Sequence, residues 1–253
     1  ASVSELVEVG LTETIAHQLP VLRDKTVFKV DPVYSPGGES IIWIPSYLSV
    51  LVNSNLVKPQ DEPKSYTDLL APRWKGQILS PDPRSAGNAP LYYVPRYFKV
   101  LDMDYYRNLA PQIQVWPGNI REGGRMVARG EYPMIFSGAT EWGASLMAEG
   151  APLKYPPLAD EWVLGIMGTI AVTKNAPHPN AARLFVNWLL SPEGQLAYCQ
   201  SGNSTPLRKD VPDFIAPGAR LNPKKILVRT WDYELWAVKD EAAKTMEQIF
   251  GAK

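Results

Sequence analysis

The sequence predicts an α/β protein, because apolar runs of strand length alternate along the chain with stretches of helical spacing. Residues 76–79 and 132–136 are short apolar runs typical of buried strands, whereas residues 120–128 and 140–148 carry the spacing of helices. Proline and glycine separate most of these runs. At 253 residues, the chain is long enough to bury one sizeable core or two smaller ones.

The overall composition narrows the classes of function. The formal net charge is zero, so there is no electrostatic reason to expect a nucleic-acid partner or an anionic membrane surface. No apolar run approaches the ~20 residues that cross a bilayer, and we expect no direct membrane insertion. The first ten residues lack the charged and apolar regions of a signal peptide, so any export signal is expected to have been removed already.

Residues that carry catalysis or bind metals are scarce. The single cysteine, Cys199, has apolar neighbours and is expected to be a small buried hydrophobe rather than a nucleophile. His17 and His178 are expected to be structural or solvated. We find no Ser-His-Asp set, no Cys-His pair, no phosphate-binding loop and no metal-ligand spacing. The sequence therefore predicts no enzyme, no cofactor and no metal site.

The first half of the chain begins with a helical pattern and a long strand. Ser65 and Asp68 have the spacing of a helix N-cap box, which predicts a short helix that Pro72 ends. The strand after it should be halted by Pro81 and Pro83. The expected elements are a helix interrupted by Gly10 (4–19), an extended segment (27–33), a strand kinked at Pro45 (41–52), a strand (76–79) and helices (88–101 and 104–109).

The second half alternates strands and helices. Ser191 supplies an N-cap, followed by Pro192 at the first helical position and the acid Glu193 in the first turn. The expected elements are strands (113–116, 132–136 and 162–172), helices (120–128 and 140–148), a helix from Pro179 and a final amphipathic helix (231–250). The helix from Pro179 should bury an apolar face formed by Ala182, Leu184, Phe185, Trp188 and Leu189.

Two segments carry a resemblance to a known family. Residues 55–83 are expected to form a helix, a proline stop, a strand and a second proline stop, in that order. Residues 170–206 are expected to form a strand, a helix that starts at a proline, a helix that starts with Ser-Pro-Glu-Gly-Gln and a Gly-x-x-Pro loop. This order resembles the extracytoplasmic solute-binding proteins of ABC importers, close to the ferric-ion-binding branch. The resemblance implies a type II periplasmic-binding-protein fold, with lobe 1 from residues 1–45 and 165–253, lobe 2 from residues 46–164, and a ligand cleft between them. Two strand-helix units that usually open lobe 1 are expected to be missing from this chain.

The same resemblance implies where a ligand would bind. The small-residue turn at 83–88 matches the loop that holds an anion in ferric-binding relatives, which gives this role to Ser85, Gly87 and Asn88. Free backbone N–H groups at a strand-to-helix turn also suit an anion on general grounds. Asn119 occupies the place of an anion-binding amide, and Arg121 could offer a guanidinium to a carboxylate or phosphonate. An ordinary turn and a solvated arginine are the alternatives for these positions.

The ligand class depends on the segment after residues 132–136. In the ferric-binding branch this segment reaches adjacent tyrosines, and here the corresponding positions are Thr140 and Glu141, which disfavours iron. An ammonium group on the ligand could pair with Glu141, and Trp142 or Trp116 could cover its apolar part. Glu141 could instead be a first-turn acid that satisfies the helix dipole. The remaining candidate contacts are Ser46, Tyr47, Ser137, Gly138 and Glu161.

The sequence thus predicts a periplasmic, monomeric binder that captures a small anionic or zwitterionic organic solute, phosphonate-like or carboxylate, by hinge closure. Its partners would be that solute and the membrane permease of an ABC importer. A ferric-iron binder of the same family is one alternative. A ligand-sensing partner of a membrane receptor is another, and an enzyme on the same fold is a third.

Overall fold

The computed structural model describes residues 3–29, 34–85, 88–89, 92, 101–116, 118, 120–156, 163–215, 226–229 and 239–251 of the 253-residue chain. The chain forms two compact units. Unit 1 contains Ala1–Ser46, Gly165–Ile215 and Val228–Tyr233, and unit 2 contains Tyr47–Leu164, Ala216–Leu227 and Glu234–Lys253. The C-terminal segments of unit 2 correct the expected division, which assigned all residues after 164 to the first lobe.

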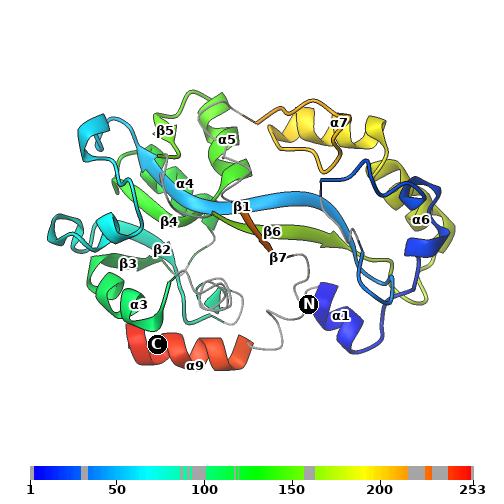
Figure 1. Ribbon diagram of the computed structural model, residues 1–253, viewed down its shortest axis with the longest axis horizontal. Helices are drawn as coiled ribbons and strands as arrows, with labels where there is room; N and C mark the ends of the chain where they lie inside the picture. The colour runs from blue at the N-terminus through cyan, green and yellow to red at the C-terminus, as the bar shows by residue number, and fades with distance from the viewer. Residues whose placement is uncertain are drawn as a thin grey trace. The chain divides into compact units, whose positions relative to one another are not determined.

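Strands and helices alternate along much of the chain, as the α/β prediction requires (Figure 1). The strands are β1 (Ile41–Asn53), β2 (Ile78–Pro81), β3 (Ile113–Trp116), β4 (Met134–Ala139), β5 (Leu153–Lys154), β6 (Val163–Ile170) and β7 (Ile226–Arg229). The helices are α1 (Val3–Glu8), α3 (Met103–Leu109), α4 (Ile120–Ala128), α5 (Thr140–Ala148), α6 (Pro179–Leu189), α7 (Pro192–Gly202) and α9 (Lys239–Phe250).

The strands form a mixed sheet in the order β3-β2-β4-β1-β6-β7, with β5 paired to β1. Strand β2 is parallel to both of its neighbours, β3 and β4. Strand β1 is antiparallel to β4 and to β5. Parallel strands need a crossover between them, and the helix-bearing segments of unit 2 supply those crossovers.

The core of unit 2 lies around the parallel strands. Ile78 and Leu79 of β2 and Met134 and Ile135 of β4 are all buried, which is the continuous apolar pattern of a strand covered on both faces. Helix α4 packs on this sheet through Gly123, where an added Cβ would lie 2.9 Å from Ile135 Cδ1. The close approach of α4 to the sheet therefore depends on the fact that glycine has no side chain at position 123.

In unit 1, the Ser-Pro-Glu-Gly-Gln segment begins α7 as predicted. The Ser191 hydroxyl accepts a hydrogen bond from Gly194 N at 3.1 Å, and Pro192 occupies the first turn. A Cβ on Gly194 would collide with the carbonyl oxygen of Trp188, so only glycine fits there. Gln195 is fully buried, and its Nε2 donates to the carbonyls of Trp43 and Leu189.

Several sequence-based details are corrected. Helix α1 ends at Glu8, because Gly10 adopts a left-handed φ of 70° and residues 11–15 leave the helix. The Ser65–Asp68 box is present, with reciprocal bonds between each side chain and the other residue's N–H, but the turn that it starts is a short 3-10 helix, Thr67–Leu70. Within the described part of 27–33, Phe28 forms only an isolated bridge, with Arg208.

The buried face of α6 also differs from the prediction. Val186 and Leu189 are buried, whereas Leu184 is 70% exposed and Phe185 is 52% exposed. The rings of Phe185 and Trp188 contact each other on the exposed side. Apolar spacing alone predicted burial of these side chains, and the described residues of unit 1 do not cover them.

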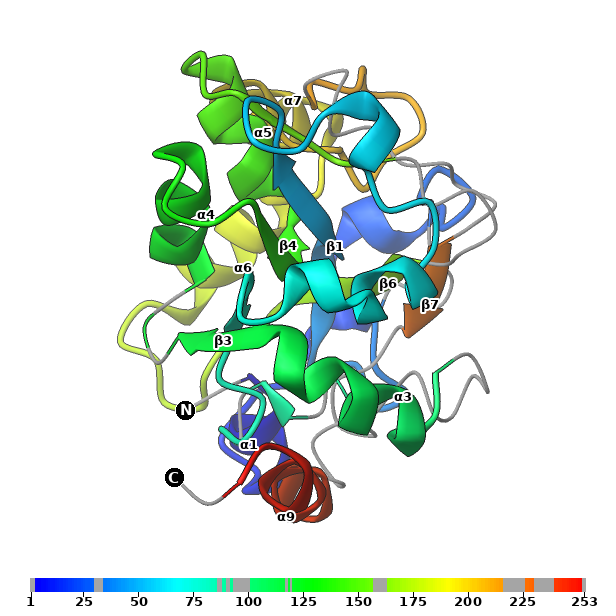
Figure 2. The same ribbon diagram turned by 90° about the vertical axis from the view of Figure 1, so that its left-hand side faces the viewer.

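Helix α9 packs in unit 2 beside α3, and not on the first lobe as expected (Figure 1, Figure 2). Its buried residues are Ala242 and Met246, one helical turn apart. The helix begins at Lys239, so the first part of the predicted helix over 231–250 lies outside the described residues.

Candidate functional site

The carboxyl ends of β2, β3 and β4 lie at one edge of the sheet, because the three strands are parallel. The register pairs Pro81 of β2 with Trp116 of β3 and Leu79 of β2 with Ile135 of β4. Helix α4 begins shortly after β3, and α5 begins directly after β4. In α/β sheets, this edge is where ligands bind, since loops and helix N-termini gather there. We call the described residues that follow β2, 82–85 and 88–89, the β2 turn.

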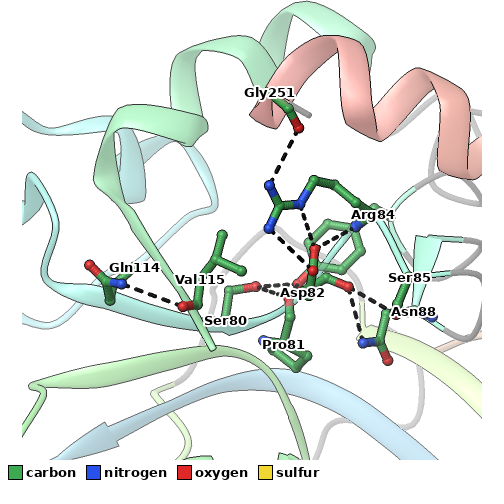
Figure 3. A network of polar contacts seen from close by, with 10 residues as sticks. Ser80, Pro81, Asp82, Arg84, Ser85, Asn88, Gln114, Val115 and Gly251 are labelled. Atoms are coloured by element: carbon green, nitrogen blue, oxygen red, sulfur yellow. Dashed lines mark hydrogen bonds and ion pairs between the residues drawn. The ribbon is translucent and has the colours of Figure 1, made fainter. Parts of the chain in front are cut away.

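The β2 turn is organised around the backbone carbonyl of Asp82 (Figure 3). The Ser85 hydroxyl and the Asn88 side-chain amide both donate to this oxygen, each at 3.1 Å. The backbone N–H of Ser85 also points to it, at 3.3 Å, while Asn88 N and Ala89 N donate to the carbonyl of Ser85. These bonds link Asp82, Ser85 and Asn88 with the helical residue Ala89 in one network.

The bonding of the turn corrects one part of the sequence interpretation. Ser85 and Asn88 were expected to present free backbone N–H donors to an anion, but both backbone N–H groups, the Ser85 hydroxyl and one N–H of the Asn88 amide donate within the turn. An anionic solute that contacts these residues would therefore use the second N–H of the Asn88 amide or displace a bond of the turn. Gly87, the third predicted residue, lies outside the described residues.

The β2 turn also contains an ion pair that the sequence analysis did not select. Arg84 donates through Nε to Asp82 Oδ1 at 2.8 Å and through Nη2 to Asp82 Oδ2 at 3.2 Å. The hydrogen bond and charge of Asp82 raise the pKa of Arg84, and the charge of Glu247 acts in the same direction. One acid and one base two residues apart occur too often in sequences for the spacing alone to reveal such an ion pair.

A buried cluster of aromatic side chains packs at the end of β2, next to the β2 turn. The hydroxyls of Ser80 and Tyr92 hydrogen-bond to each other, and Tyr92 also donates to the carbonyl of Pro81 at 3.3 Å. The Tyr92 ring packs against Tyr106 and Phe136. Burial raises the pKa of Tyr106 well above its ordinary value, so this phenol stays neutral.

The second predicted region follows β3. Asp82 N donates to the carbonyl of Trp116 at 3.1 Å, which ties the end of β3 to the start of the β2 turn. The Trp116 ring lies over Gly118, where a Cβ would come within 2.6 Å of it. Arg121 is exposed in the first turn of α4. Asn119 lies outside the described residues.

The third region is the junction of β4 and α5. Between the pairs Ser49–Gly138 and Leu51–Ile135, β1 advances two residues and β4 three, so a bulge inserts one extra residue into β4 at 136–137. Bulges of this kind re-aim a strand and are frequent beside functional sites. The predicted contacts Ser137 and Gly138 lie at this bulge. Thr140, Glu141 and Trp142 form the first turn of α5. For all five residues, the structure describes the backbone but not the side chain.

The structure describes the backbone of Ser46 and Tyr47 but not Glu161, the last of the predicted contacts. Tyr47 immediately precedes Leu48, which pairs with Ala139 at the carboxyl end of β4, so its backbone reaches the same edge. Ser46 is the last residue of the first segment of unit 1, and its side chain, like that of Tyr47, is not described. Glu161 lies outside the described residues.

Acids, histidines and cysteine do not converge in the part of the chain that the structure describes. No group of three or more such side chains within those residues could hold a metal ion. Cys199 is buried as predicted, and burial raises the pKa of its thiol to about 11. No helix among the described residues has the length and hydropathy needed to cross a membrane.

The fold and the sheet edge define a class of protein, the two-lobe ligand binders with the type II periplasmic-binding-protein fold. Residues 37–202 match the model of the bacterial extracellular solute-binding proteins. This match covers more than half of the chain, and the chain belongs to that family.

Three similar proteins extend the comparison. An uncharacterized protein of Haemophilus influenzae is 28% identical over 192 residues, a match that spans 75% of this chain and 55% of that relative. The periplasmic binding protein AfuA of Actinobacillus pleuropneumoniae, solved with fructose-6-phosphate bound, is 25% identical with a TM-score of 0.74, covering 99% of this chain and 80% of its own. Iron-bound HitA of Pseudomonas aeruginosa shares the fold at 20% identity and a TM-score of 0.74, covering 98% of this chain and 79% of its own.

Proposed function

We propose that this protein is the solute-binding component of an ABC-type importer in the periplasm, and that it captures a small organic solute carrying a phosphate, phosphonate or carboxylate group. The permease of that importer would be its membrane partner. The observation that carries the proposal is the convergence of the β2 turn, the start of α4 and the start of α5 at one edge of parallel strands. The first backbone N–H groups and the positive dipole ends of α4 and α5 favour an anion at such an edge.

The solved relative that carries fructose-6-phosphate supports an organic phosphate as the first cargo to test. The ferric-binding relatives are less than 25% identical, and their likeness supports the fold but not the metal. Thr140 is a poor ligand for ferric iron, which requires anionic oxygen donors. Glu141 and Trp142, in the same turn of α5, would suit an ammonium or apolar part of a zwitterionic solute. Hinge closure on the solute stays a prediction.

The proposal is tested by a thermal-shift screen with fructose 6-phosphate, phosphonates, amino acids, polyamines, thiamine, carboxylates and ferric salts. A ligand at a hundredfold excess over Kd stabilises the protein by about 2.7 kcal/mol, which such a screen detects. Stabilisation by an anionic or zwitterionic organic compound supports the proposal. A tight, coloured ferric complex would show that the argument from Thr140 and Glu141 is wrong.

The position of the site is tested by calorimetric titration of the best ligand into three variants. Glu141→Gln should weaken binding by about tenfold, the effect of one hydrogen bond to a charged group. Ser85→Ala should weaken it by a similar factor, because the hydroxyl that orders the β2 turn is lost. Ser54→Ala is the control, because the Ser54 hydroxyl also donates to a backbone carbonyl, that of Pro152, but lies past the opposite end of the β1–β4 pair. Unchanged affinity in both site variants would mean that the site lies elsewhere.

A further inference from the structure

Arg84 joins two parts of unit 2 that are far apart in the sequence. Its Nε and Nη2 bind the carboxylate of Asp82, and its Nη1 donates to the backbone carbonyl of Gly251 at 3.4 Å (Figure 3). The Arg84 and Asp82 side chains are only 16% and 14% exposed. Shielding from solvent makes an ion pair stronger and its geometry better defined than that of a pair on the open surface.

The end of α9 suits a cationic partner. Gly251 follows the last helical residue, Phe250, and adopts a left-handed φ of 82°. The carbonyls at a helix C-terminus carry partial negative charge, which a guanidinium neutralises. Glu247, one helical turn before Gly251, adds a full negative charge whose attraction is felt at Arg84. Both the helix end and this acid therefore favour Arg84 in its observed position.

We propose that Arg84 is a positioning residue that fastens the β2 turn to the C-terminal end of α9, so that α9 sets the shape and hence the affinity of the solute site. This inference rests on the proposed function, because it assigns α9 a role in a site built partly from the β2 turn. Arg84 acts here through Asp82, whose carbonyl orders Ser85 and Asn88, and not through contact with the solute. A change at the end of α9 is thereby transmitted to the turn.

The fastening itself is tested by hydrogen exchange on the ligand-free protein. In Arg84→Gln, peptides that contain Gly251 and peptides that contain Ser85 should both exchange about tenfold faster, because one charged hydrogen-bond network is lost at both ends. Arg73→Gln is a matched control: Arg73 also pairs with an aspartate side chain and a backbone carbonyl, both of Asp61. It should leave both peptides unchanged. Unchanged exchange at Gly251 in Arg84→Gln, or equal acceleration in Arg73→Gln, would overturn the proposal.

The transmission is tested by a double-mutant cycle on the Kd for fructose 6-phosphate or, if another compound binds in the screen, for that compound. Arg84→Gln should weaken binding about tenfold, and Glu247→Gln about twofold. In the Arg84→Gln background, Glu247→Gln should have no further effect, since its influence passes through Arg84. Additive effects would overturn the positioning role. If the unaltered protein binds no anionic compound, the proposed function fails, and the exchange measurement still decides whether Arg84 fastens α9.

Discussion

The side-chain amide of Asn53 donates a hydrogen bond of 2.7 Å to the backbone carbonyl of Val127, near the C-terminal end of α4. A second bond reaches the carbonyl of Ala128 at 3.3 Å, and Asn53 Oδ1 accepts from the N–H of Asn55. The last residue of β1 therefore caps the helix whose other end begins at the candidate site. Since Asn53 is buried, water cannot replace these bonds.

We predict that Asn53→Ala lowers the free energy of unfolding by about 2 kcal/mol, because two carbonyls at the end of α4 lose their buried donor. Chemical denaturation measures the difference. Asn55→Ala is the control, because Asn55 is exposed, and it should change the stability by less than about 0.5 kcal/mol. Equal effects of the two substitutions would contradict the capping role of Asn53.

Gln195 joins three backbone groups in unit 1. Its Nε2 donates to Trp43 O and Leu189 O, and its Oε1 accepts from Leu207 N at 2.7 Å. Gln195→Leu keeps the volume but leaves all three groups buried without this partner, so a loss of about 3 kcal/mol is expected. Gln200→Leu, at an exposed position of the same helix, should be nearly neutral in the same denaturation experiment.

Gly123 and Gly124 are neighbours in α4 with different surroundings. Alanine at Gly124 would make an ordinary contact, 3.5 Å from Leu146 Cδ1, and should stabilise the protein by about 0.5–1 kcal/mol through helix propensity. Alanine at Gly123 would be pressed against the buried Ile135, and overpacking costs about 1–3 kcal/mol. Melting temperatures should therefore rank Gly124→Ala above Gly123→Ala, and the reverse order would show that α4 can move away from the sheet.

The buried thiol of Cys199 makes stability depend on alkaline pH. Burial raises its pKa from the ordinary 9.0 to about 11, so between these values the folded protein keeps a proton that the unfolded chain has released. The stabilisation from the neutral thiol is complete below pH 9 and is lost as the pH rises through 11. The stability advantage of the protein over Cys199→Ala should shrink across this range, whereas a constant difference would mean that the thiol does not titrate in this way.

Local features of this fold were predictable because their partners are close in the sequence. The N-cap at Ser191 and the reciprocal Ser65–Asp68 box each join residues three apart, so a short pattern identifies them. The strand at 113–116 and the helices at 120–128 and 140–148 were also predicted with the bounds that the structure has. The candidate site was predicted only as a set of loops, and their convergence required the parallel pairing of β2 with β3 and β4.

By itself, then, the sequence determined the α/β class, the order of the main elements and the family resemblance, because periodicity, caps and proline positions are properties of neighbouring residues. Only the tertiary structure decided that α9 packs in unit 2, that Leu184 and Phe185 face outward, and that Arg84 joins Asp82 to Gly251. These outcomes depend on groups up to 167 positions apart in the chain. Many alternative pairings at such separations share the same local pattern, and packing and hydrogen bonding in the folded chain select among them.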